Sequence, residues 1–350
     1  MNNLNNHIED KNEGEKFSFF SALKRLFADV PERPRKIIGE RYGLKTGKKK
    51  TLEEIGKEYG ITRERVRQII RETVKKIKKA KNESLSETGK RLEFTIQEKN
   101  GIMQEEKILS ESLEPKERGA IKFFLHISDN IVFREISGEL KKSWMIKSFD
   151  FSEWKKVKDG IKLILEKNQK SLAENEILKE VREFEKKDIE RKKLLDYLDV
   201  SAEIQKSHFG KWGLAAWDEI NPRGTREKIY LVLKEVKKPI HFREIAIFID
   251  KYGLSGKKKA HPQTVHNELI RDNRFILVGR GTYALAEWGY RKGTVKEVLE
   301  SIFKENSKLL SREEIISKVL SIRKVKKSTV LINLNSFFQK AGKNEYFIKK

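Results

Sequence analysis

Apolar residues recur at helical spacing along most of the chain, and short polar or glycine-containing breaks separate the recurring stretches. The first stretch, "FSFFSALKRLFADV", predicts a helix from five apolar positions: Phe19, Phe20, Leu23, Leu26 and Phe27. A second helix is expected to end near Tyr42–Gly43, where glycine can take the left-handed conformation that terminates helices. The polar residues 1–16 show no such period, and we expect them to be a disordered tail.

Two capped helices follow within residues 51–79. Thr51 is placed as an N-cap, and Glu54 stands three residues later, as in a capping box. Gly60 ends this helix, and Thr62 caps a second helix that continues to about residue 79. Two helices joined by a short glycine-containing turn predict a helix-turn-helix domain, with bounds at 17–81.

The rest of the chain divides into one small module and three similar units. A polar linker is expected at 82–90. Residues 91–154 are expected to form a small α+β module, with a winged helix as the alternative. Each following unit has three helical stretches and then a hairpin pattern, which is the winged-helix plan. The predicted units are 155–217, 224–288 and 293–350.

An internal repeat supports these units. "GKWGLAAW" (Gly210–Trp217) matches "GTYALAEW" (Gly281–Trp288) in its glycine, aromatic, leucine–alanine and tryptophan positions. Because Trp217 and Trp288 recur at the same point, we expect them to pack in or between units. The expected fold is therefore mainly α and multi-domain, with a helix-turn-helix domain followed by tandem winged-helix modules.

Charge is distributed unevenly along the chain. The net charge is +24, with 77 basic and 53 acidic residues. Residues 1–81 carry a net +10 and 224–350 a net +15, whereas 82–150 carry −2 and 151–223 carry +1. A uniformly lysine-rich composition would not leave residues 82–223 nearly neutral, so the pattern favours polyanion-binding domains at both ends of the chain. Cysteine is absent, and no apolar run long enough for a membrane span occurs, so we expect a soluble cytoplasmic protein.

The second helix of the 51–79 pair presents side chains suited to DNA bases. Arg63, Glu64, Arg67 and Gln68 share one helical face. Arginine can pair with guanine, glutamine with adenine, and glutamate with the cytosine amino group. Nearby residues Arg41, Lys57 and Arg65 are expected to meet phosphates. The alternative is a solvated helix whose charges pair with one another.

"TLEEIGKEYGITRERVRQI" closely resembles region 4 of the sigma-70 family of transcription initiation factors, and "PERPRKIIGERYGL" resembles the first half of that region. The resemblance covers about residues 20–80. It implies binding of double-stranded DNA at a promoter −35 element and docking on the β-flap of the RNA polymerase core. It places Arg63, Glu64, Arg67 and Gln68 at base-contacting positions. Positions that touch or adjoin phosphates are then Arg41, Leu52, Thr62 and Arg65.

Two features depart from that family. Glu72 stands where a basic residue is common, which puts downstream backbone contacts in doubt. Only about 20 residues precede the motif, so we expect no room for the region that melts the −10 element in complete sigma factors.

"HPQTVHNELIRDNRFILVGRGTYALAEWGY" resembles a HARE-HTH domain, the winged-helix module also found in the RNA polymerase delta subunit and in restriction systems. The resemblance is best over 224–288. A secondary nucleic-acid surface is expected there from six basic residues: Lys257, Lys258, Lys259, Arg271, Arg274 and Arg280. Alternatively, its third helix only packs and the lysines aid solubility. The nearly neutral unit 155–217 is expected to be a spacer or protein-binding face.

No catalytic, cofactor or metal motif is visible. His261 and His266 have a possible ligand spacing, but no third ligand accompanies them. We therefore expect no enzymatic activity, no cofactor, no metal, no membrane partner and no small-molecule substrate. The function expected is that of a prokaryotic, nucleoid-associated transcription factor acting in initiation. The alternatives are a delta-like polymerase subunit working mainly through protein contacts, and a DNA-defence or modification-sensing component.

Overall fold

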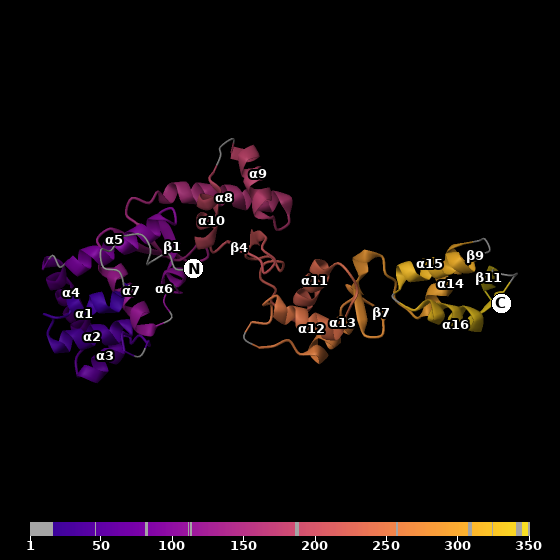
Figure 1. Cartoon of the computed structure of the whole chain (residues 1–350), viewed down its shortest axis with the longest axis horizontal. Coiled ribbons are helices and arrows are strands. Elements are labelled where there is room, and N and C mark those ends of the chain that lie inside the picture. Colours follow the sequence, from indigo (N-terminus) through magenta and orange to yellow (C-terminus); the bar gives the residue numbers. More distant parts are fainter. Residues whose placement is uncertain are drawn as a thin grey trace. The chain divides into compact units, whose positions relative to one another are not determined.

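The structure is a computed structural model that describes most of the chain (Figure 1). The described residues are 17–45, 47–80, 83–110, 112, 114–185, 189–256, 258–306, 310–323, 325–340 and 345–348. The tail expected to be disordered, 1–16, lies outside them. The fold is mainly helical with small antiparallel sheets, in two compact units, Met1–Gln205 and Lys206–Lys350. Among the described helices, none has both the length and the apolar character needed to span a bilayer.

The first unit begins with four helices, as predicted. They are α1 (Phe19–Leu26), α2 (Glu32–Tyr42), α3 (Leu52–Tyr59) and α4 (Arg63–Lys79). Gly43 and Gly60 end α2 and α3 with φ angles of 69° and 64°, in the left-handed region that glycine adopts without strain. The caps at Thr51 and Thr62 are also confirmed.

A three-stranded module follows these helices. Its elements are α5 (Glu83–Gln97), β1 (Ile102–Gln104), α6 (Glu105–Ser110), α7 (Pro115–Ile127), β2 (Ile131–Ile136) and β3 (Leu140–Ile146). The sheet is antiparallel with β3 in the middle, in the order β1–β3–β2. The predicted linker 82–90 is wrong, because residues 83–90 are helical. Thr88 is buried there, and its hydroxyl donates to the Ser84 carbonyl at 2.6 Å, so a polar side chain fills a core position of the helix.

Three further helices complete the first unit. They are α8 (Phe151–Asn168), α9 (Glu174–Glu185) and α10 (Arg191–Val200). Since α8 begins at Phe151, the predicted boundary between 154 and 155 falls inside a helix. The division between the two units lies within the short hairpin of β4 (Ile204–Lys206) and β5 (Trp212–Leu214).

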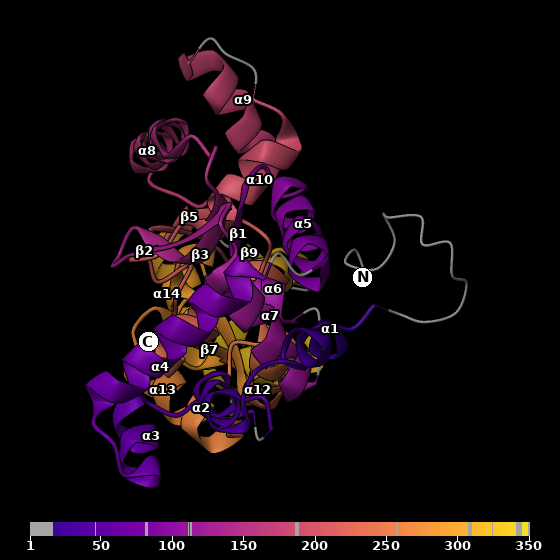
Figure 2. The ribbon, with the colours of Figure 1, turned by 90° about the vertical axis from the view of Figure 1, so that its left-hand side faces the viewer.

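The helix-turn-helix helices and the next module share one hydrophobic core. Phe19 and Leu23 of α1 belong to the same cluster as Leu92 of α5 and Phe123 and Phe124 of α7. Both views show α1 beside α7, and the two helices are in contact (Figure 2). The predicted domains 17–81 and 91–154 are therefore not separate bodies, because their apolar faces cover each other.

The second unit contains two modules with separate cores. The first comprises α11 (Thr225–Val236), β6 (Ile240–His241), α12 (Phe242–Lys251), α13 (Pro262–Arg271), β7 (Phe275–Gly279), β8 (Thr282–Leu285) and the 3-10 turn η1 (Ala286–Trp288). The second comprises α14 (Val295–Glu305), β9 (Leu310–Ser311), α15 (Arg312–Ile322), α16 (Lys327–Phe337), β10 (Phe338–Lys340) and β11 (Glu345–Ile348). Trp288 packs against the first core, as expected for a structural tryptophan.

Three modules repeat one element order. Residues 83–146, 225–285 and 295–348 each run helix, strand, helix, helix, strand, strand, and the last strand is always central in the sheet. Residues 151–214 follow the same order, except that a single bridge residue, Leu172, stands in place of the first strand. The third helices of the four modules, α7, α10, α13 and α16, are thus equivalent in position.

Candidate nucleic-acid interface

The turn between α3 and α4 is held by a close backbone approach. The Ile61 amide donates to the Gly56 carbonyl at 2.9 Å. A Cβ atom added at Gly56 would lie 2.6 Å from the Ile61 carbonyl oxygen, so only glycine fits this position without a shift. Ile55 of α3 and Val66 of α4 are fully buried against Ile37 of α2, and this packing fixes the angle of the two helices.

Caps position the start of each helix. The Thr51 hydroxyl accepts from the Glu54 amide at 3.2 Å, and the Glu54 carboxylate accepts from the Thr51 amide at 2.7 Å. The Thr62 hydroxyl accepts from the Arg65 amide at 3.2 Å. Each cap uses one of the free amides at its helix start, and the other amides of the first turn have no partner within the helix.

The four expected base-contacting residues lie together on the outer face of α4. Arg63, Glu64 and Arg67 are exposed, and Gln68 is half-buried. The Arg67 guanidinium donates twice to the Glu64 carboxylate, at 2.8 and 2.7 Å, and these bonds lower the pKa of Glu64. This i,i+3 pair is the contact that the alternative of a solvated helix with paired charges predicts.

The expected phosphate-contacting residues flank this face. Arg41 donates to the Lys50 carbonyl at 3.0 Å, and Lys57 pairs with Glu53 at 3.4 Å. Arg65 donates to the Gln68 side chain at 3.3 Å. The side chain of Leu52 packs against the helix-turn-helix core. Leu52 can therefore meet a phosphate only through its backbone amide.

The expected secondary surface is only partly open. Lys257 lies outside the described residues, and Lys258 and Lys259 are exposed before α13. Arg274 pairs with Asp272 at 2.6 Å and with Glu227 at 3.5 Å. The remaining two arginines are exposed: Arg271 lies at the end of α13, 3.8 Å from Glu268, and Arg280 lies in the β7–β8 turn.

His261 is exposed, whereas His266 and a cluster of carboxylates pack within the fold. His266 stacks on Phe242 with ring centroids 4.4 Å apart. Elsewhere, Glu139, Asp159 and Glu203 converge, but the Lys158 ammonium lies among them, 3.0 Å from Glu139 and 2.7 Å from Asp159. A lysine thus supplies the positive charge at the centre of this acidic cluster.

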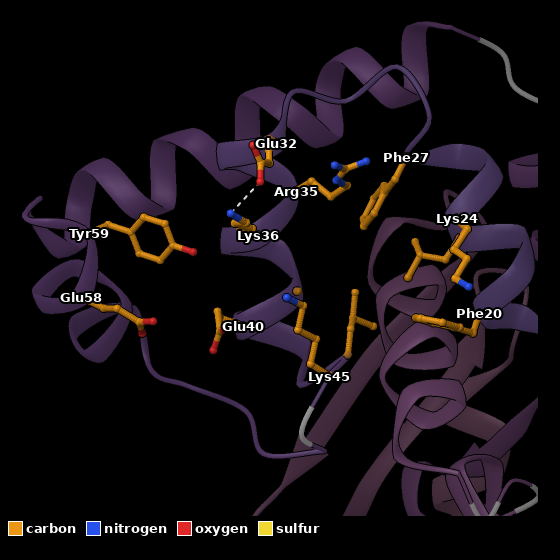
Figure 3. Close-up of a pocket in the computed structure, with 13 residues that line it drawn as sticks. Phe20, Lys24, Phe27, Glu32, Arg35, Lys36, Glu40, Lys45, Glu58 and Tyr59 are labelled. Carbon is orange, nitrogen blue, oxygen red and sulfur yellow. Dashed lines mark ion pairs between the residues drawn. The ribbon is translucent and has the colours of Figure 1, made fainter.

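A hollow of about 700 Å³ that the sequence did not reveal lies between α1 and α3, over α2 (Figure 3). Phe20 and Phe27 approach it from one side and Tyr59 from the other. Its rim is charged and includes the Glu32–Lys36 pair at 2.6 Å. The lining comes from three helices, so helical periodicity of any one of them could not have predicted it.

Comparison with known proteins bears on this N-terminal part. Residues 26–79 match the family model of sigma-70, region 4. Over 57 residues the chain is 44% identical to the RNA polymerase principal sigma factor HrdD of Streptomyces viridifaciens, and equally identical to that of Streptomyces coelicolor. It is 40% identical over 63 residues to the sigma factor SigA of a Bacillus species. The matched stretch covers 16–17% of this chain and 17% of each relative.

The region 4-like segment comprises the last residue of α1 and the whole of α2, α3 and α4. Its similarity to sigma factors supports a DNA-binding role in transcription initiation for this segment. All of the residues expected from the sequence to contact bases lie within it.

Proposed function

We propose that the chain is a sequence-specific, double-stranded DNA-binding protein that acts in transcription initiation and reads a −35-like promoter element with α4. The observation that carries this proposal is the exposed face of Arg63, Glu64, Arg67 and Gln68 on a capped second helix. In helix-turn-helix proteins this helix enters the major groove and its N-terminal residues contact base edges. The similarity of residues 26–79 to sigma-70 region 4 supports the same role.

Phosphate contacts would set the register of α4 on the duplex. Thr62 and Arg65 lie at its start, and Arg41 and Lys57 lie on the neighbouring helices. Such contacts supply affinity without sequence information, and they make binding depend strongly on salt.

The RNA polymerase core is the second proposed partner, through its β-flap. The hollow between α1 and α3 supports this role, because the side formed by Phe20, Leu23 and Phe27 is apolar and its rim is charged. Such a site suits an amphipathic helix of another protein.

We further propose that the four modules with the repeated element order are winged helices, of the HARE-HTH type over 224–288. Their order of helices and strands, with a C-terminal hairpin, supports this assignment. In the first unit, α7 and α10 are covered by neighbouring elements, which favours a scaffold role for their modules. The covered helices also favour the second candidate function, a delta-like polymerase-associated subunit that works mainly through protein contacts.

We propose no catalytic activity, cofactor or small-molecule substrate for the chain, and a cytoplasmic, nucleoid-associated location. The test uses the full chain in two assays. Binding to duplexes with and without a −35-like element is measured by fluorescence anisotropy at several salt concentrations. Co-purification of polymerase core is measured after nuclease treatment. Equal affinity for both duplexes would refute base reading by α4, and retention of polymerase without base preference would support the delta-like alternative.

A further inference from the structure

The third helices of the first unit are covered by protein. A Cβ added at Gly119 of α7 would lie 2.7 Å from the Tyr42 carbonyl oxygen of α2, so these helices approach closely. Asp196 of α10 accepts from Asn100 at 2.7 Å, and the Asp199 carbonyl of α10 accepts from Lys141 at 3.0 Å. Neither helix presents a free face of the kind needed to enter a groove of DNA.

The third helix α13 has a different environment. Val265 and Leu269 are buried in its own module, and five residues of the opposite side are exposed. These are Gln263, Thr264, Asn267, Ile270 and Arg271. Gln263, Asn267, Ile270 and Arg271 stand at i, i+4, i+7 and i+8, so they form one stripe along the helix.

The chemistry of this stripe matches base edges. The Gln263 amide donates to the Asn267 side-chain oxygen at 3.3 Å, so the two amides lie side by side. Glutamine and asparagine pair with adenine through two hydrogen bonds, and an apolar side chain contacts the thymine methyl group. Ile270 is 65% exposed and is therefore accessible to a thymine methyl group.

The electrostatics around α13 suit a polyanion. Its first turn contains no acidic residue, and Lys258 and Lys259 precede it. The Glu268 carboxylate pairs with Arg226, and Asp272 pairs with Arg274. The acidic groups near the stripe are therefore neutralised within the module, while Lys258 and Lys259 form no ion pair with a described residue.

The equivalent helix α16 lacks the same stripe. Its buried Val330 and Leu334 correspond to Val265 and Leu269. In that register, Ser328 replaces Gln263 and Ile332 replaces Asn267. The amide pair is thus specific to α13 and is not required by the repeated fold.

We propose that α13 enters the major groove of duplex DNA and reads a second sequence block, containing A·T pairs, through Gln263 and Asn267. Ile270 contacts a thymine methyl group, and Lys258, Lys259 and the turn residue Arg280 contact the backbone. The chain then recognises two blocks, one through α4 and one through α13. This second site does not depend on base reading by α4.

The experiment selects duplexes from a randomised library with the full chain. The wild-type protein is expected to enrich two blocks. Gln263→Ala and Asn267→Ala should each lower the preference for one A·T-containing block by about ten-fold to a hundred-fold and leave the other block unchanged. Arg67→Ala should lower the preference for the block read by α4 and leave the A·T-containing block unchanged. Both α13 positions are exposed, so thermal unfolding should match that of the wild type, which separates lost reading from lost folding.

Backbone contact has its own control. Lys259→Ala should weaken binding to all sequences and reduce the slope of log affinity against log salt by about one. Lys238→Ala, at an exposed lysine between α11 and β6, should leave the slope unchanged. The proposal is overturned if selection yields only a block that Arg67→Ala abolishes, or if a second block survives both α13 substitutions. If α4 does not read bases, the block assigned to α4 should be absent from the selection, and the A·T-containing block assigned to α13 should still be enriched.

Discussion

For the proposed reading of bases, Arg67 offers an exposed side chain that hydrogen bonds already hold in one orientation. Its two hydrogen bonds to Glu64 orient the guanidinium on the outer face of α4, away from the buried side of that helix. No core contact depends on it. A change at Arg67 can therefore alter DNA binding without altering the fold.

We expect Arg67→Ala to lower affinity for the cognate duplex by about 1–3 kcal/mol and to relax preference at one base pair. Thermal unfolding should be unchanged, because the side chain is exposed. Anisotropy titrations against duplexes with single base-pair substitutions measure the effect. Arg25→Ala on the exposed side of α1 is the matched control and should leave base preference intact. Equal loss on every duplex would contradict direct base reading.

Lys158, unlike the exposed Arg67, is buried, and its charge contributes to the stability of the fold. Its side chain is 4% exposed, and its ammonium is shared by Glu139, Asp159 and Glu203. Burial opposes the charge of Lys158, but hydrogen bonds to the carboxylates raise its pKa. Burial likewise opposes the charge of Glu203, but hydrogen bonds from Lys158 and Lys162 lower its pKa. This cluster joins α8 to the β2–β3 turn.

We expect Lys158→Met to destabilise the chain by about 3–5 kcal/mol at neutral pH, because three carboxylates lose their shared cation. In the wild type, a carboxylate with a lowered pKa stabilises the fold above its unfolded-state pKa, and this contribution is lost as the pH falls. The variant should behave in the opposite way and regain stability as the pH falls toward about 4, where carboxylates become protonated. Urea unfolding at several pH values measures both trends. Lys155→Met, at a half-exposed neighbour, is the control and should have a small effect.

At the scale of elements, two helical glycines have different surroundings. A Cβ at Gly56 would meet the Ile61 carbonyl oxygen at 2.6 Å, whereas a Cβ at Gly39 in α2 would meet only Leu44 Cδ1 at 3.9 Å. We expect Gly56→Ala to destabilise by about 1–3 kcal/mol and to weaken DNA binding, because the turn must open. Gly39→Ala should stabilise by about 0.5–1 kcal/mol, since it removes unfolded-state entropy. Thermal unfolding of both variants measures the contrast, and equal effects would refute the close approach in the turn.

The sequence predicted the helix-turn-helix well because its signals are local. Thr51, Glu54, Gly60 and Thr62 act within one turn of themselves, so their roles do not depend on distant parts of the chain. The helix over 83–90 could not be predicted in this way. Thr88 can occupy a core position there only because its hydroxyl donates to the Ser84 carbonyl, and a threonine in a polar stretch of sequence does not indicate such a position.

Features that need several elements could not be predicted. The hollow between α1 and α3 exists only because three helices meet. The common core of α1 and α7 joins residues about one hundred positions apart, and no periodicity within either helix identifies its partner. The same limit applies to α10, whose covering by Asn100 and Lys141 depends on the packing of two modules.

For the whole molecule, the shared core determines which fragment can contain a folded region 4-like segment. Phe19, Leu23 and Leu26 of α1 are buried against α5 and α7. Cutting the chain after α4 would expose this apolar surface to water, and small domains have little stability to lose. The region 4-like helices are therefore expected to fold only with the module that follows them.

We expect a fragment of residues 17–214 to unfold cooperatively on heating, whereas a fragment of residues 17–80 should show a broad transition at lower temperature and weaker DNA binding. Circular dichroism measures the unfolding transition, and anisotropy measures the DNA binding.

Within the longer fragment, Phe123→Ala should lower the free energy of unfolding by about 3–5 kcal/mol, because Phe123 contacts both Phe27 and Tyr42 at ring-centroid distances of 5.3 Å. Since Phe123 lies outside the region 4-like segment, a loss of DNA affinity in this variant would show that the following module supports the reading helix. Wild-type stability and affinity of the 17–80 fragment would contradict the shared core.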